Sequence, residues 1–141
     1  MQLNHTNPFR QGLHYGFLGF LLVQLLFIPQ YGFGLDIPTL VVQMVVLLIL
    51  FALNYFAVNR YQRPPETPIT LSLILKIVMV ATGVIYILYN IETGIYDAFF
   101  EEDGLHWAHI VLLLLSAFGA GLYGLVISLI LWGLNAIKTK L

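Results

Sequence analysis

The chain contains no cysteine, so it forms no disulfide, offers no thiolate nucleophile and holds no cysteine-ligated metal. Charged residues are also scarce: they make up 9% of the 141 residues, whereas a soluble domain carries about a quarter. Hydrophobic residues make up 60%, and the mean hydropathy is +0.89. This composition indicates a membrane protein with one helical domain and no room for a separate soluble module.

Four apolar stretches each approach the roughly 20 residues that cross a bilayer. They predict transmembrane helices over about 11–28, 38–58, 68–90 and 106–137. Helices are expected rather than strands, because no alternating pattern is visible and lipid requires an internally satisfied backbone. The predicted fold class is therefore all-α: a polytopic membrane protein whose single domain, 1–141, has four transmembrane helices.

Positive and negative charges are separated along the chain. The six basic residues lie in or next to the N-terminus, the middle loop and the C-terminal tail: Arg10, Arg60, Arg63, Lys76, Lys138 and Lys140. Six of the seven acids lie in or next to the other two loops: Asp36, Glu92, Asp97, Glu101, Glu102 and Asp103. Only Glu66 breaks the pattern. Because Lys and Arg in short loops mark the cytoplasmic side, both termini are predicted to be cytoplasmic.

Lys76 is the one charge predicted to lie well inside a membrane helix. It follows Pro68 by eight residues, about 12 Å along a helix. Its side chain either snorkels to the cytoplasmic surface or pairs with a group outside this chain, for which an anionic lipid phosphate is the natural choice.

Other hydrogen-bond donors are expected in the inner leaflet near Lys76, among them His14, Asn54, Asn59 and Arg60. Two interpretations stay open. The ring of donors is either the ordinary positive-inside signal with helix-end capping, or a headgroup site for an anionic lipid.

Two glutamines lie inside the first predicted hairpin. Gln24 precedes Pro29 by five residues and Gln43 follows Pro38 by five, so their amides are expected at similar depth on antiparallel helices. We expect an interhelical hydrogen bond between them, since amides join membrane helices more often than they bind substrates.

A weak metal-binding pattern occurs at the start of the fourth predicted helix. Glu102, His106 and His109 share a helix face at spacings of four and three if the helix begins early. A carboxylate and two imidazoles are suitable zinc ligands. The alternative is an acidic solvated loop with interfacial histidines.

Small residues recur at spacings that allow helices to approach closely. Gly12 and Gly16 form a GxxxG motif, and Ala117, Ala120, Gly121 and Gly124 form two similar pairs. The packing is either internal or between copies in a homo-oligomer. No phosphate-binding glycine loop, nucleophile elbow or acid–base pair is present. We therefore expect no enzymatic activity, no cofactor and no nucleic-acid partner.

Two segments carry a resemblance to a known family. They are Phe9-Arg10-Gln11-Gly12-Leu13-His14-Tyr15-Gly16-Phe17-Leu18-Gly19 and Asn54-Tyr55-Phe56-Ala57-Val58-Asn59-Arg60-Tyr61. The first is similar to the opening segment of the GtrA-like family of small four-helix membrane proteins. The second resembles the Asn-Phe-x-x-Asn-Arg-x-Trp run that ends that family's second helix.

The resemblance implies a role in cell-surface polysaccharide synthesis in a bacterial or archaeal plasma membrane. It implies that the chain translocates or presents a polyprenyl-phosphate-linked sugar, or scaffolds the membrane glycosyltransferase that uses it. The residues leave a second function open: a non-catalytic accessory subunit of a larger membrane complex, docked through the long fourth helix.

Overall fold

The computed structural model describes residues 7–28, 33–34, 37–61, 69–100 and 107–138, without the side chains of 27, 39, 93–100, 107–109 and 112. Four α-helices make up this part of the chain: α1 (Pro8–Phe27), α2 (Thr39–Asn59), α3 (Leu71–Phe100) and α4 (Trp107–Lys138). The predicted all-α fold class and the number of helices are confirmed.

Local sequence signals set several helix ends. The side chain of Asn7 accepts a hydrogen bond of 2.9 Å from the Phe9 N–H and caps α1, and Pro8 occupies its first turn. Thr70 caps α3 in a similar way, because its hydroxyl accepts from the Leu73 N–H at 3.3 Å. At the end of α2, the Arg60 N–H still donates to Phe56 O at 2.9 Å.

Helix α3 differs most from its predicted bounds. We expected a helix over 68–90, whereas α3 begins at Leu71 and continues to Phe100. The predicted helix ended just before the first acidic residue of this segment. Acidic residues end the part of a helix that can lie in lipid, but the helix itself can continue through them. No proline lies between Leu71 and Phe100, and the two glycines there, Gly83 and Gly94, are tolerated in a helix interior. α2 and α4 each begin and end one residue later than predicted, and α1 begins three residues earlier.

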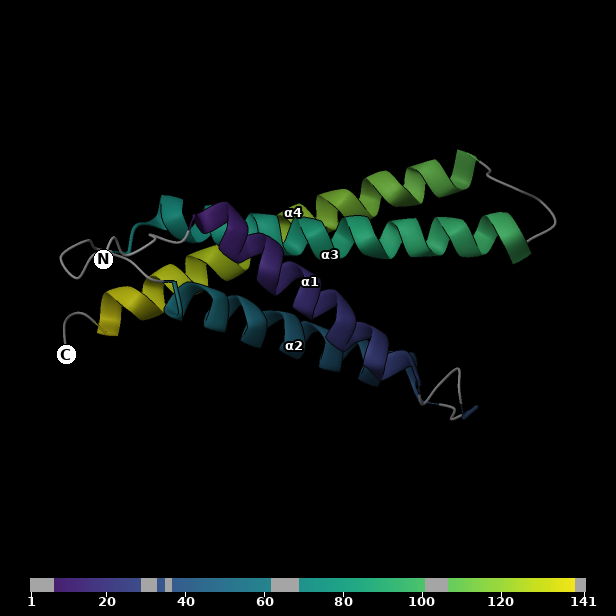
Figure 1. The fold of residues 1–141 in the computed structure, drawn as a ribbon, viewed down its shortest axis with the longest axis horizontal. Coiled ribbons are helices and arrows are strands. Elements are labelled where there is room, and N and C mark those ends of the chain that lie inside the picture. Colours follow the sequence, from purple (N-terminus) through teal and green to yellow (C-terminus); the bar gives the residue numbers. More distant parts are fainter. Residues whose placement is uncertain (1–6, 29–32, 35–36, 62–68, 101–106, 139–141) are drawn as a thin grey trace, which may run out of the picture.

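The helices run up and down, so that four helix ends meet at one end of the bundle (Figure 1). α1 and α3 begin there, and α2 and α4 end there. We call this the basic end, because Arg10, Arg60, Lys76 and Lys138 lie in the helix turns nearest to it. α3 is central: it packs against the other three helices, whereas α1 and α4 are not in contact over their described residues.

The buried core lies in the half of the bundle next to the basic end. It consists of Ala57, Val58, Ile74, Ile77, Val78, Ile127 and Leu131, from α2, α3 and α4. Every member of this cluster is aliphatic. Most large apolar side chains instead lie on the outside, among them Leu48 at 67% exposed and Phe118 at 68%.

Glycines bring α1 against α3. A Cβ atom added to Gly12 would lie 2.8 Å from Ile77 O, and one added to Gly16 would lie 2.7 Å from Ala81 O. Both distances are too short for a side chain, so the two backbones are in direct contact. The GxxxG motif therefore serves an internal interface. On α4, Gly124 faces side chains of α3 and no backbone atom: its added Cβ would lie 2.7 Å from Met79 Sδ.

Three of the four helices are long and apolar enough to cross a membrane. Within the described residues these stretches are Leu40–Asn59, Leu71–Glu92 and Leu113–Lys138. α1 does not meet the same standard, because its 20 residues include Arg10, Gln11, His14 and Gln24. The helices also differ in length: about 30 Å for α1 and about 45 Å for α3, from 20 and 30 residues.

Candidate lipid-facing site at the basic end

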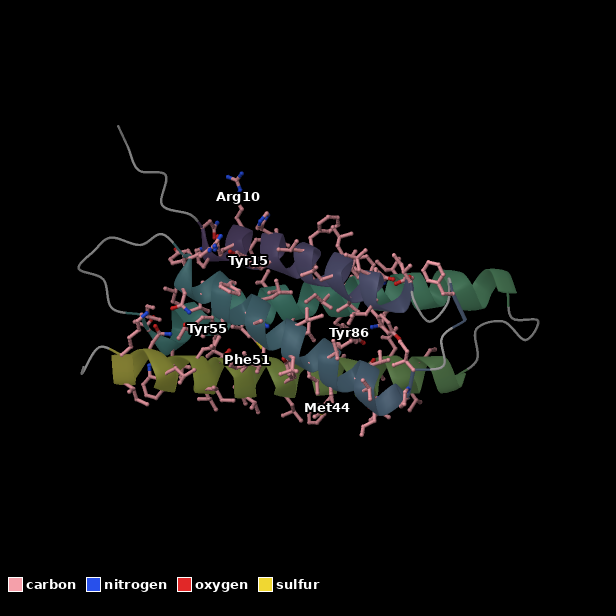
Figure 2. All side chains as sticks on the ribbon, turned by 90° about the horizontal axis from the view of Figure 1, so that it is seen from below. Arg10, Tyr15, Met44, Phe51, Tyr55 and Tyr86 are labelled. Carbon is pink, nitrogen blue, oxygen red and sulfur yellow. The ribbon has the colours of Figure 1, made fainter. Side chains whose placement is uncertain are left out.

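Four basic side chains that the structure describes are exposed around the basic end, one on or directly after each helix. Arg10 lies in the first turn of α1, Arg60 follows α2, Lys76 lies in the second turn of α3, and Lys138 ends α4. Arg10 projects away from the helices (Figure 2). Among residues whose side chains the structure describes, no acid forms an ion pair with any of them. Over the described residues, this end of the bundle therefore carries a rim of four positive charges and no acid.

Asn59 and Arg60 lie together on the outside of α2, where it ends. The Arg60 guanidinium lies 5.9 Å from the centre of the Phe56 ring, within the range of a cation–π contact. The Asn59 side-chain amide donates to Tyr55 O at 2.9 Å, which leaves its carbonyl oxygen and its second N–H toward the surroundings. Both residues remain accessible to a headgroup from outside the bundle.

Asn54 was predicted to belong to the same ring, but it faces the core. Its side chain is only 2% exposed, and its Nδ2 donates to Leu50 O at 2.9 Å. The prediction used only its position near the end of α2. Its neighbour Val58, one turn along the helix, belongs to the buried cluster, and that places Asn54 on the inward face.

Lys76 faces away from the core of the bundle. It is exposed, whereas Ile74 and Val78, two residues to either side, are 0% exposed. Two residues correspond to about 200° around a helix, so Lys76 points to the side opposite both. Five residues separate it from the start of α3 at Leu71, about 7.5 Å. From this position a lysine side chain can extend toward the N-terminus of its helix.

His14 likewise points away from the packed face of its own helix, α1. It lies two residues from Gly12 and from Gly16, which pack on α3, and its own side chain is exposed. Its ring contacts Tyr15 edge-on at 5.5 Å. The structure therefore places His14, Asn59, Arg60 and Lys76 on outward faces of three different helices. They form parts of a perimeter and not one enclosed pocket.

The predicted pair of Gln24 and Gln43 is wrong. Gln24 on α1 donates from Nε2 to Oε2 of Glu92 on α3, and Gln43 is exposed on α2. The prediction considered only sequence-adjacent helices. α1 packs more extensively on α3 than on α2, and the extension of α3 places a carboxylate within reach of the amide.

The predicted metal ligands lie outside the part of the structure that can be described. Glu102 and His106 fall outside the described residues, and of His109 only the backbone is described. The zinc hypothesis stays a prediction. Among the described residues, no three His, Asp or Glu side chains come close enough to hold a metal ion.

Three hydrogen bonds between helices were not predicted from the sequence. Gln11 donates to Ala57 O at 3.2 Å, which joins α1 to α2, and the Tyr123 hydroxyl donates to Leu47 O at 3.1 Å, which joins α4 to α2. The Tyr86 hydroxyl donates to Leu113 O and links α3 to α4. All three acceptors are backbone carbonyls, which carry no residue-specific signal in a sequence.

Neither a protein-family model, nor a curated protein, nor a solved structure matches this chain. We therefore infer what the site can bind from its residues and their placement alone. Exposed guanidinium, ammonium and amide donors at one end of an apolar bundle are suited to phosphate oxygens at a membrane surface.

Proposed function

We propose that this chain is an integral membrane protein of four spans that binds the phosphate of an anionic lipid at its basic end. Both termini lie in the cytoplasm. By the family resemblance, the lipid is a polyprenyl-phosphate-linked sugar, which the protein translocates or presents to a membrane glycosyltransferase for cell-surface polysaccharide synthesis. The observation that carries the proposal is the rim of four exposed basic side chains, none of which has an acidic partner among the side chains that the structure describes.

The proposal includes α1 as a span in spite of its polar residues. Gln11 and Gln24 are satisfied by Ala57 O and Glu92, so neither amide is left without a partner in lipid. Gly12 and Gly16 allow α1 to pack directly against α3, which is itself long and apolar enough to cross a membrane. A helix that uses its polar groups in this way can cross the bilayer as part of the bundle, although its composition alone does not indicate it.

The packing of the core supports presentation at the surface of the bundle. Ile74, Ile77 and Leu131 are each 0% exposed and fill its centre next to the basic end. A phosphate does not enter such a site, because a charge without a partner is costly in an apolar interior. The headgroup would instead bind on the perimeter, where Arg60 and Lys76 are exposed.

The test is lipid binding by two separate variants, Arg60→Ala and Lys76→Ala. Each removes one basic side chain worth about 1 kcal/mol near an anionic surface, so each should weaken binding about fivefold. The two residues lie on or directly after different helices, so their losses of binding free energy should add when both are replaced. Glu92→Gln, in the other half of α3, is the matched control. Native mass spectrometry with polyprenyl phosphate measures the bound fraction, and binding equal to wild type in both variants would refute the proposal.

A second function is favoured by a different part of the molecule. Every side chain of α4 described between Leu113 and Gly119 is exposed, and Gly119 and Gly121 have open space where a Cβ would be. An accessory subunit would use this face for a helix of a membrane complex or of a second copy. Purification in mild detergent should then recover a partner in fixed ratio or a homo-oligomer, and recovery of the monomer alone would refute this function.

A further inference from the structure

Two oxygen atoms in the interior of the bundle have no hydrogen-bond partner among the described residues. They are Asn54 Oδ1 on α2 and Thr82 Oγ1 on α3. The two residues are 2% and 7% exposed. Almost all buried polar groups in proteins are hydrogen-bonded, to protein or to ordered water. Two such atoms without partners in one small bundle therefore indicate a missing group.

The two residues lie at the same level of the bundle. Val58 on α2 and Val78 on α3 belong to one buried cluster. Asn54 is one helical turn from Val58, and Thr82 is one turn from Val78. Because α2 and α3 are antiparallel, both steps lead away from the basic end (Figure 1). The turns that carry Asn54 and Thr82 thus lie at a similar level, one turn beyond the cluster.

The atoms at this level specify the chemistry of the missing group. Leu50 O accepts a hydrogen bond from the Asn54 amide, and that contact identifies its nitrogen, so the atom without a partner is the carbonyl oxygen. The carbonyl oxygen only accepts hydrogen bonds, whereas the Thr82 hydroxyl can donate one or accept one. An anion does not fit, because it would meet the carbonyl oxygen with like polarity.

A metal cation does not fit either. Hard cations require about six oxygen ligands, and the described groups supply two free oxygens and no negative charge. Ser128, the other buried hydroxyl, already donates to Gly124 O at 2.7 Å. A water molecule suits both oxygens: it donates to Asn54 Oδ1 and accepts from, or donates to, Thr82 Oγ1.

We propose that Asn54 and Thr82 bind one ordered water molecule between α2 and α3. The two side chains do not bond to each other in the structure. A water joins two oxygens that are about 4.5 Å apart, because its two hydrogen bonds of about 2.8 Å meet near the tetrahedral angle. The site is internal and separate from the lipid-binding rim, and it does not depend on the proposed function.

The test is water-edited solid-state NMR of the full chain in bilayers, with ¹⁵N-labelled asparagine. The signal of the Asn54 side-chain amide is assigned by its loss in Asn54→Leu. In the wild type, this amide should gain magnetisation from water although it is buried. Thr82→Val, which replaces only the hydroxyl by a methyl group, should abolish the gain. Ser128→Ala is the matched control, because it removes a buried hydroxyl that has its own partner, and it should leave the gain unchanged.

Three results would overturn the proposal. The first is a wild-type Asn54 amide that gains no magnetisation from water while the exposed Asn59 amide does. The second is a gain that persists unchanged in Thr82→Val. The third is a combination of two results: the wild type shows no transfer from water, and Thr82→Val shifts the Asn54 amide signal. Together they would indicate a direct hydrogen bond between Thr82 and Asn54. If Thr82→Val does not fold, Thr82→Ser keeps the hydroxyl and should keep the gain; loss of the gain in that variant counts against the proposal.

Discussion

Replacement of Gly16 by alanine tests the contact between α1 and α3 on which the bundle depends. The added Cβ would lie 2.7 Å from Ala81 O and 2.8 Å from Val84 Cβ. Carbon atoms in contact are normally about 3.5–4.0 Å apart, so the new methyl group is roughly 1 Å too close. The nearest obstacle is backbone, which cannot rotate aside. α1 therefore has to move away from α3.

The loss of stability can be estimated from the kind of neighbour. Forcing a methyl group into a packed interface costs about 2 kcal/mol, or about a thirtyfold change in the unfolding equilibrium. Gly19→Ala should cost less, because its nearest neighbour, at 2.7 Å, is the end of the flexible Ile85 side chain. Gly83→Ala meets no atom within 4 Å and should be neutral or stabilising by up to about 1 kcal/mol, since alanine is the better helix former.

The measurement is reversible unfolding of the three variants in the same lipid or detergent, followed by circular dichroism or by steric trapping. The expected order of stability is Gly83→Ala, then Gly19→Ala, then Gly16→Ala. Equal stability of Gly16→Ala and Gly83→Ala would show that α1 does not pack on α3 through its glycines, and the interface would have to be reassigned.

Two further predictions concern the polar contacts and the orientation. Gln24→Leu should lower stability by about 1 kcal/mol, because the Glu92 carboxylate loses its amide donor, whereas Gln43→Leu should not, because Gln43 is exposed; equal losses in an unfolding assay would contradict the observed pairing. Because the chain contains no cysteine, single cysteines can report topology without background: Asn59→Cys should react with a membrane-impermeant maleimide only after cell lysis, and Phe33→Cys in intact cells, and the reverse pattern would invert the proposed orientation.

The sequence was sufficient to predict the number and approximate position of the helices, because long apolar runs separated by proline and charge have few alternatives. The far end of α3 was not predictable in this way. Hydropathy falls after Asn90, yet the helix continues to Phe100. Hydropathy reports where a segment leaves the lipid, whereas the end of a helix depends on backbone propensity and capping.

The candidate site was predictable only as a set of residues at one end of the molecule. The separation of charges placed Arg60 and Lys76 near that end, and the predicted helix bounds placed His14 there. The directions of these side chains depend on which helix faces are covered. This depends on packing: Gly12 and Gly16 turn His14 outward, and the core positions beside Lys76 do the same for α3. Asn54 was misplaced for the same reason, since its depth was inferred correctly but its inward direction was not.

The unequal lengths of the helices have a consequence for the surrounding bilayer. The apolar span of α2 has 20 residues and that of α4 has 26, or about 30 Å and about 39 Å. To fit a 30 Å hydrocarbon layer by tilting alone, α4 would need an angle of about 40°, the upper end of the range observed for membrane helices. In a bilayer, a smaller tilt would require the lipids beside α4 to stretch relative to those beside α2. We expect the protein to thicken the membrane on one flank only, and so to gather longer-chain or more ordered lipids around α4.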